Sequence, residues 1–251
     1  MFSAIAPTYD LLNTTLSLGV DAWWRKQAVT AAFEGLTPTS ATLLTASPRV
    51  LDVATGTGKL ALALKRRRPA ASVTGIDFAE PMLAVARSTA ARAGLDVGFE
   101  QGDGTALPFD DASFDLLTIA YGLRNFADPD AGLREFRRVL RPGGRLVILE
   151  FPPPREGVFG RLFSAYFERV MPRIGAAVSG QRDAYAYLPR SVRGFMEPGE
   201  LTEHLLAAGF GPVEYRLQSY GISALHVAEL PTISAPEASL TTGSKRSVKG
   251  G

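Results

Sequence analysis

The chain contains no cysteine and only two histidines, and these shortages remove whole classes of function. Without cysteine there is no disulfide and no thiolate ligand for a metal, and two histidines are too few for a typical zinc site, so we expect no metal centre. No apolar run reaches the roughly 18 residues that suggest a membrane span, and no secretory leader or internal repeat is visible. We therefore expect a cytoplasmic globular protein.

An excess of charge of either sign is also missing. The 251 residues carry 27 lysines and arginines against 25 acidic residues, a formal net charge of +2. The segment 231–251 accounts for this excess, with Lys245, Arg246 and Lys249 against Glu237. The rest is close to neutral, which does not favour nucleic-acid binding. We expect the serine-, threonine- and glycine-rich segment to be a disordered tail, whereas the rest can bury the core of one α/β domain.

A strand, a glycine turn and a helix follow one another in residues 50–65. A phosphate-binding P-loop is excluded, because Val53 stands where its first glycine is required and Leu60 where it has serine or threonine. A dinucleotide fingerprint survives weakly, since Ala61 can replace its third glycine. A turn that binds S-adenosylmethionine is the third interpretation, because the acid Asp52 lies on the strand just before the glycines. A tight turn without a ligand is the fourth.

Two further segments with strand character each end in an acid. The segment 73–77 ends in Asp77 and the segment 97–103 ends in Asp103, and we expect an apolar fourth strand over 114–120. A carboxylate at the end of the second strand can accept hydrogen bonds from ribose hydroxyls, and Asp103 can accept one from an adenine amino group. Three acids at successive strand ends favour an adenosyl cofactor. The candidate cofactor-binding residues are Asp52, Gly56, Thr57, Gly58, Asp77, Phe78, Asp103, Gly104 and Ala120.

Together these motifs resemble those of the class I S-adenosylmethionine-dependent methyltransferases. More narrowly, the chain resembles the quinone-biosynthesis C-methyltransferases, which methylate demethylmenaquinol and, in other members, a ubiquinol precursor. The narrower match rests on an opening segment, a YGLRN motif and a second signature. These three lie at residues 2–25, Tyr121–Asn125 and Arg138–Phe151. The resemblance runs from about residue 2 to about residue 230.

The resemblance implies an α/β fold of the Rossmann-like class I methyltransferase type. Such a fold has a mostly parallel seven-stranded sheet with an antiparallel closing strand and helices on both faces. We expect a last helix over 197–208 and the closing pair of strands over 213–217 and 222–227. The expected organisation is an N-terminal helical cap at 1–48, the methyltransferase domain at 49–230 with a lid insertion at about 153–195, and the tail at 231–251.

The implied reaction transfers the sulfonium methyl group to a ring carbon of demethylmenaquinol, with a ubiquinol precursor or another lipophilic phenol as the alternative substrate. The methyl group is already a strong electrophile, so the protein mainly aligns the ring carbon with the S–CH₃ bond. A quinol hydroxyl must also lose or share its proton, and the ring proton must leave afterwards. Arg124 is the candidate that stabilises the developing oxyanion or polarises a basic water, with a surface ion pair as its alternative role. Tyr121 is the second catalytic candidate. The candidate substrate contacts are Tyr9, Asn13, Tyr185, Tyr187 and His226.

Residues 159–171 place aromatic and aliphatic side chains at helical spacing. This pattern fits a core-facing helix, and it also fits the wall of a pocket for a polyprenyl tail. A lipophilic polyprenyl quinol is the expected partner. Peripheral contact at the inner face of the cytoplasmic membrane and a homodimer are further expectations.

Lys59 is the main departure from the family pattern, which usually has an acid after the glycines. A lysine near a sulfonium cation is unfavourable if it is buried and unscreened. This residue keeps open a second class of function, a noncatalytic S-adenosylmethionine-binding scaffold subunit.

Overall fold

The computed structural model describes residues 19–34, 47–154 and 189–232. Most of the expected N-terminal cap, most of the lid insertion and nearly all of the tail lie outside these ranges. The same holds for the apolar segment 159–171 and for four candidate substrate contacts, Tyr9, Asn13, Tyr185 and Tyr187. The domain boundaries and these contacts stay predictions.

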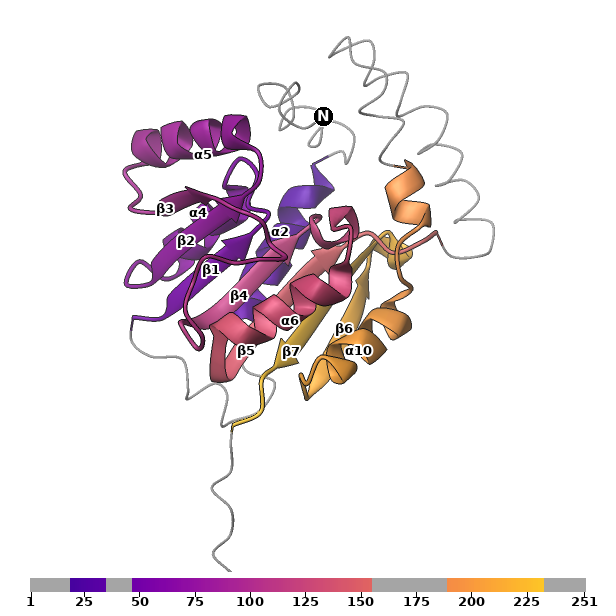
Figure 1. Cartoon of the computed structure of the whole chain (residues 1–251). Coiled ribbons are helices and arrows are strands. Elements are labelled where there is room, and N and C mark those ends of the chain that lie inside the picture. The colour runs from indigo at the N-terminus through magenta and orange to yellow at the C-terminus, as the bar shows by residue number, and fades with distance from the viewer. Residues whose placement is uncertain (1–18, 35–46, 155–188, 233–251) are drawn as a thin grey trace, which may run out of the picture.

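Seven strands form one sheet in the described residues (Figure 1). They are β1 (Arg49–Val53), β2 (Ser72–Asp77), β3 (Gly98–Gln101), β4 (Phe114–Ala120), β5 (Leu140–Glu150), β6 (Val213–Gln218) and β7 (Ser223–Glu229). Their spatial order is β3-β2-β1-β4-β5-β7-β6, and β7 runs antiparallel to both of its neighbours. The predicted α/β class and the antiparallel closing strand are confirmed. Because the chain winds outward from β1 to β3 and then returns to β4, the carboxyl ends of β1 and β4 form the switch point of the sheet.

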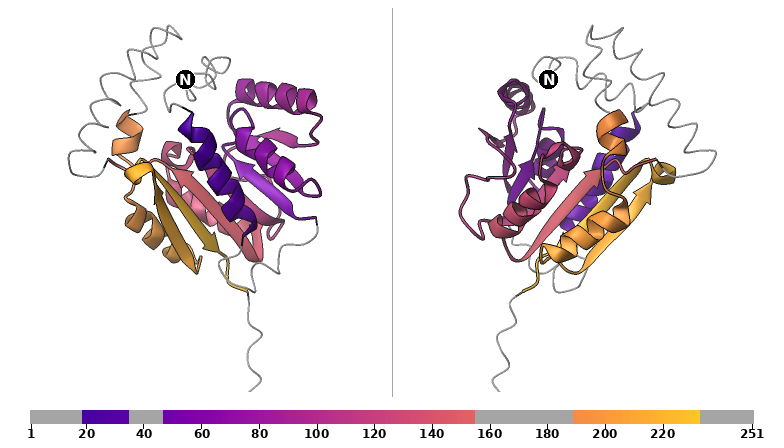
Figure 2. Two further views of the ribbon diagram at one scale, coloured as in Figure 1. Left: turned by 180° about the vertical axis from the view of Figure 1, so that it is seen from behind. Right: turned by 45° about the vertical axis from the view of Figure 1, so that its right-hand side comes forward.

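Helices cover both faces of this sheet (Figure 2). They are α2 (Val20–Phe33), α4 (Lys59–Arg67), α5 (Glu80–Ala93), α6 (Pro129–Val139) and α10 (Pro198–Ala207), with the short 3₁₀ helices η2 (Leu123–Asn125) and η4 (Ser219–Gly221). Apolar side chains of α2 and α4 share one core with the sheet, whereas those of α6 and α10 share a second core on the opposite face.

The central strand β4 shows how the apolar pattern builds both cores. Leu116 packs in the core that contains α2, while Leu117 and Ile119 pack in the core that contains α6. All three side chains are completely buried, and burial of each is worth about 1.5–3 kcal/mol. An apolar residue on both faces is what a central parallel strand requires, and the predicted bounds of this strand are confirmed.

The edge strand β3 is shorter than predicted. The sequence indicated a strand over 97–103, but only Gly98–Gln101 pair with β2. The strand lies at the margin of the sheet, and Gly98, Glu100 and Gln101 are exposed. A strand with one neighbour and little burial has few contacts that extend it.

Candidate active site

The carboxyl ends of β1, β2 and β4 bring the predicted cofactor contacts to one edge of the sheet. The turn after β1 holds Gly56 and Gly58 at φ values of +56° and +78°, and Gly58 caps α4. A Cβ on Gly58 would lie 2.9 Å from Phe99 Cζ and 3.0 Å from Ala86 Cβ, so a larger residue does not fit without movement. Because Gly58 caps α4, the N-terminus of this helix lies at the same edge. The N–H groups of a helix N-terminus favour electron-rich ligand atoms.

Asp77, the last residue of β2, is hydrogen-bonded to the glycine turn. Its Oδ2 accepts the backbone N–H of Gly56 at 2.8 Å, and its Oδ1 accepts that of Ala79 at 2.8 Å. Burial raises the pKa of this carboxyl, and the two N–H donors partly oppose the rise. Each carboxylate oxygen has a further lone pair that can accept a ligand hydroxyl. The geometry supports the predicted ribose-binding role.

Asp52 lies on β1 and is 1% exposed. Its Oδ1 accepts the hydroxyl of Thr118 on β4 at 2.6 Å, and its Oδ2 accepts the hydroxyl of Thr55 in the turn at 2.6 Å. Burial raises the pKa of Asp52 from 3.8 to about 6, and the two hydroxyl donors oppose that rise. Because so little of the side chain is exposed, Asp52 ties the glycine turn to β4 and acts as a positioning residue.

The remaining predicted cofactor contacts surround the same edge. Asp103 is exposed, and its Oδ1 accepts both the N–H and the hydroxyl of Thr105 at 2.8 Å. Phe78 is 79% exposed, which is unusual for so large an apolar side chain. A Cβ on Gly104 would lie 2.4 Å from Phe126 Cζ, so this position requires glycine. Thr57 in the turn is buried, and Ala120 at the end of β4 is half-buried.

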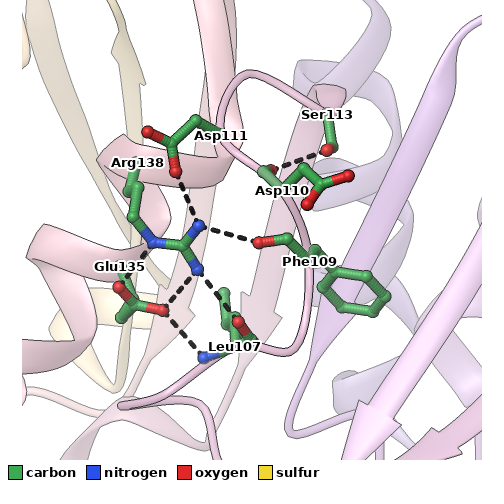
Figure 3. Close-up of polar contacts among 7 residues, drawn as sticks. All are labelled: Leu107, Phe109, Asp110, Asp111, Ser113, Glu135 and Arg138. Carbon is green, nitrogen blue, oxygen red and sulfur yellow. Dashed lines mark hydrogen bonds and ion pairs between the residues drawn. The ribbon is translucent and has the colours of Figure 1, made fainter.

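Arg138 of α6 holds the loop between β3 and β4 in place (Figure 3). Its Nη2 donates to the Leu107 carbonyl at 2.9 Å, and its Nη1 donates to the Phe109 carbonyl at 2.7 Å and to Asp111 Oδ1 at 2.8 Å. Glu135 accepts from Arg138 Nε at 2.7 Å and from the Leu107 N–H at 2.8 Å. The hydrogen bond from Arg138 is the main cause that lowers the pKa of Glu135. This clamp fixes the chain that follows Asp103.

Arg124, the main catalytic candidate, forms a buried ion pair. It lies in η2, just after β4, and its Nη1 is 2.6 Å from Oε1 of Glu150 at the end of β5. The two side chains are 4% and 2% exposed, so the alternative of a surface ion pair does not hold. Nη1 also donates to the Tyr121 carbonyl. The Arg124 Nε is buried and has no hydrogen-bond partner among the described residues.

Tyr121 packs in an aromatic cluster beside this ion pair. Its ring stacks on Phe151 with centroids 4.4 Å apart, and Phe151 meets Trp24 of α2 edge-on at 5.8 Å. Its φ of +58° is rare for a residue other than glycine and marks a constrained loop. Burial raises the pKa of the Tyr121 hydroxyl above its ordinary value, so this group stays protonated at neutral pH and can act as a donor but not as a base.

His226 is held under the start of α10. Its Nε2 is 2.9 Å from the Pro198 carbonyl, and its ring stacks on Tyr215 of β6 at 5.2 Å. A carbonyl only accepts, so Nε2 carries the proton, and burial lowers the pKa of the imidazole. These contacts give His226 a packing role, and in the described residues it does not join the groups around Asp77 and Arg124.

Lys59 is the first residue of α4 and is half-buried. Its charge is therefore partly screened by solvent, which weakens the objection that a buried lysine would raise against a cationic ligand.

Three residues that position the site were not assigned a role from the sequence. Glu150 pairs with Arg124, Thr118 bonds to Asp52, and Arg138 clamps the loop after β3. Two of them leave a signal in the sequence. Glu150 is a charged residue at the end of an apolar run, and Thr118 is a polar residue inside an apolar run.

The donors and acceptors at this edge fit S-adenosylmethionine. Asp77 and Asp103 supply carboxylates at adjacent strand ends, two glycines let the backbone approach closely, and Phe78 offers an exposed ring. Across the described ranges no group of three or more histidine, aspartate or glutamate side chains is arranged to hold a metal ion. Within the same ranges, no helix combines the length and the apolar character needed to cross a membrane.

Known proteins are similar to this chain in sequence and in fold. The ubiE/COQ5 methyltransferase family matches residues 1–229. A demethylmenaquinone methyltransferase from Thermus thermophilus is 52% identical over 92% of this chain and 100% of its own length. Another from Deinococcus radiodurans is 51% identical over 91% of this chain and 90% of its own length. A solved methyltransferase from Aquifex aeolicus that depends on S-adenosylmethionine has the same fold, with a TM-score of 0.54 and 20% identity over 80% of this chain and 91% of that one. The strand-end acids, the sheet order and the sequence match agree, and the chain belongs to the ubiE/COQ5 methyltransferase family.

Proposed function

We propose that this protein transfers a methyl group from S-adenosylmethionine to a ring carbon of demethylmenaquinol. The observation that carries the proposal is the link between Asp77 and the glycine turn, at the edge that also holds the Arg124–Glu150 pair. Family membership supports methyl transfer, and the names of the two similar relatives support the substrate.

Cofactor binding follows from groups at the strand ends. Asp77 would accept from the ribose hydroxyls and Asp103 from the adenine amino group, while Phe78 covers an apolar part of the ligand. When bound, S-adenosylmethionine supplies an electrophilic methyl group. Asp52 holds the turn in the shape that receives the ligand, through Thr55.

Arg124 is the residue that we assign to the quinol oxygen. Glu150 fixes the guanidinium, so no side-chain freedom is lost when a substrate binds. The buried Nε of Arg124 is a donor that makes no hydrogen bond to any of the described residues. A hydrogen bond from it would favour the ionised form of the quinol hydroxyl and so activate the ring.

Cofactor binding is tested by calorimetric titration of S-adenosylmethionine into Asp77→Ala, with Asp96→Ala as the matched control. Asp96 is an exposed acid in the turn after α5. Loss of two hydrogen bonds to a carboxylate should weaken binding by about a hundredfold or more, and the control should bind normally. Equal binding by both variants would exclude the assigned role of Asp77.

Catalysis by Arg124 is tested without leaving a carboxylate buried and unpaired. Arg124→Met alone would do so at Glu150, so it is combined with Glu150→Gln. Glu150→Gln alone is the control, because it removes the same carboxylate while its amide oxygen can still accept a hydrogen bond from the Arg124 guanidinium. We expect the double variant to bind S-adenosylmethionine normally and to turn over about a hundredfold more slowly than the control. Unchanged turnover would show that Arg124 does not act on the substrate.

One labelling experiment distinguishes between the candidate substrates and also between a methyltransferase and a noncatalytic scaffold. Protein with radiolabelled S-adenosylmethionine is offered demethylmenaquinol, a ubiquinol precursor or a total quinol extract. The proposal expects labelled menaquinol. Label in another product would show that the protein acts on a different substrate. Cofactor binding with no label in any quinol would favour the scaffold role.

We also propose that the end of the molecule formed by η4 and the start of α2 touches the membrane surface that contains the substrate. Val20 at the start of α2 is 37% exposed and Tyr220 in η4 is 86% exposed. A hydrogen bond of 3.0 Å from Trp24 Nε1 to Ser219 Oγ joins these two elements. Flotation with anionic vesicles should retain the protein, and Val20→Ser with Tyr220→Ser should reduce that retention. Equal flotation of both proteins would exclude this surface.

A further inference from the structure

The strand β6 forms one margin of the sheet, next to β7 alone (Figure 1). Residues 214–217 within it are exposed. An edge strand presents a row of N–H and C=O groups that another strand can pair with. Beyond the proposed function, we propose that β6 pairs antiparallel with β6 of a second copy of this chain, giving a two-fold symmetric dimer with one continuous sheet.

The hydrogen bonds to β7 determine which backbone groups of β6 point outward. The Pro212 carbonyl accepts the Glu229 N–H at 3.1 Å, and the Leu230 N–H bonds to Gly144 at 2.8 Å on the other side of β7. Hydrogen-bonded pairs recur at every second residue of an antiparallel ladder. Residues 214, 216 and 218 therefore bond to β7, and the N–H and C=O groups of residues 213, 215 and 217 point to the free edge.

A register centred on the strand satisfies both these backbone groups and the charges. Outward residues must face outward residues, so Tyr215 can lie opposite Tyr215 of the partner subunit, on the two-fold axis. Glu214 then lies opposite Arg216 of the partner subunit, and Arg216 opposite Glu214 of the partner subunit. A slip by two residues in one direction places Glu214 opposite its own copy, and a slip in the other direction does so for Arg216. Like charges directly opposite are destabilising, so both slips are disfavoured.

Both charged side chains are available for this pairing. Glu214 and Arg216 line a groove of about 220 Å³ together with Trp23 and Gln27 of α2. Neither one takes part in an ion pair with another residue of the described ranges. In the proposed register they occupy the pairs without backbone hydrogen bonds, where opposite side chains approach most closely.

Apolar side chains flank the strand and enlarge the contact. Trp23 of α2 and Leu217 are 48% and 39% exposed, Tyr215 is 44% exposed, and Leu206 of α10 is 52% exposed. Leu206 lies beside the start of β6, since its Cδ2 would be 3.9 Å from a Cβ on Gly211. Two strands alone bury little surface, whereas these side chains supply the apolar area that a specific interface needs.

Charge reversal tests the register. The full chain is measured by sedimentation equilibrium over a wide range of concentrations, as wild type, Arg216→Glu, Glu214→Arg and the double variant that carries both changes. We expect a wild-type dimer, a dimer about tenfold weaker in each single variant, and recovery in the double variant, which restores opposite charges. Glu100→Arg, on the opposite edge strand β3, is the matched control and should dimerise like the wild type.

Amide hydrogen exchange gives a second, independent readout. The amides of Tyr215 and Leu217 should exchange more slowly as the protein concentration rises, because they point to the free edge. The amide of Arg216 should not change, since β7 already protects it. A wild-type protein that is monomeric at every concentration would overturn the proposal. So would a dimer that Arg216→Glu leaves intact, or one in which the exchange of Tyr215 does not depend on concentration.

Discussion

Replacing Asp52 by asparagine should stabilise the protein at neutral pH and leave its stability nearly unchanged in acid. Burial raises the pKa of Asp52 from 3.8 to about 6. A group whose pKa is higher in the folded state contributes stability below its unfolded pKa and loses that contribution as the pH rises through the folded pKa. The ionised carboxylate is thus a cost above about pH 6, and this rise in pKa corresponds to about 3 kcal/mol.

Asparagine is close in shape to aspartate, and it cannot ionise. The hydroxyls of Thr55 and Thr118 can either donate or accept, so the amide keeps both partners. The loss of charge is therefore the main change. The matched control is Asp96→Asn, at an exposed acid.

The assay is urea unfolding of the wild type and both variants between about pH 4 and about pH 8. The difference in unfolding free energy between Asp52→Asn and the wild type should rise across this range by about 3 kcal/mol and level off above about pH 7. Asp96→Asn should show a flat difference. A flat or falling difference for Asp52→Asn would refute the reasoning, because it would mean that folding does not raise the pKa of this carboxyl.

Three further predictions concern residues of the candidate active site. Affinity for S-adenosylmethionine, measured by calorimetry, should fall as the pH is lowered through the raised pKa of Asp77, because the protonated carboxyl accepts fewer hydrogen bonds; a constant affinity would contradict this. Gly58→Ala should lower the free energy of unfolding by about 2–4 kcal/mol, because it adds a clash to the left-handed conformation. Gly94→Ala, where φ is +62° but no atom lies within 4 Å, should cost only about 1 kcal/mol, and equal losses would show that the clash is absent. Arg138→Met should weaken cofactor binding by about tenfold while the fold persists, because it releases the loop after Asp103; unchanged binding would mean that the loop holds its place without the clamp.

The sequence predicts the central part of the sheet well because burial there dictates the residue types. The bounds of β4 are confirmed, since both faces of that strand are covered and every position but Asp115 and Thr118 is apolar. The convergence of Asp52, Asp77 and Asp103 also follows from the sequence, because the carboxyl ends of parallel strands meet at one edge. At the margin, β3 lacks this constraint, and its predicted length is wrong.

Side-chain partners are much harder to predict than strands. Glu150 is 26 residues from Arg124, and the two meet because β4 and β5 pair in a particular register. The same is true of Thr118 and Asp52, which are 66 residues apart. An apolar pattern gives the face of a strand but leaves the register between strands open. For that reason the sequence indicates Arg124 as a catalytic cation or as part of a surface ion pair, whereas the structure pairs it with a buried acid.

These two pairs explain how the end of β4 is held. On one side, Asp52 of β1 accepts the hydroxyl of Thr118, and on the other side, Glu150 of β5 binds the guanidinium of Arg124. Buried charges add little to stability, because desolvation offsets much of what pairing returns. What they provide here is position: Asp52 on β1 fixes Thr118 of β4, and Glu150 on β5 fixes Arg124 in η2, just after β4. The cofactor turn and the candidate catalytic arginine are thereby set relative to one central strand, and a methyl donor and its acceptor need such a shared reference to align.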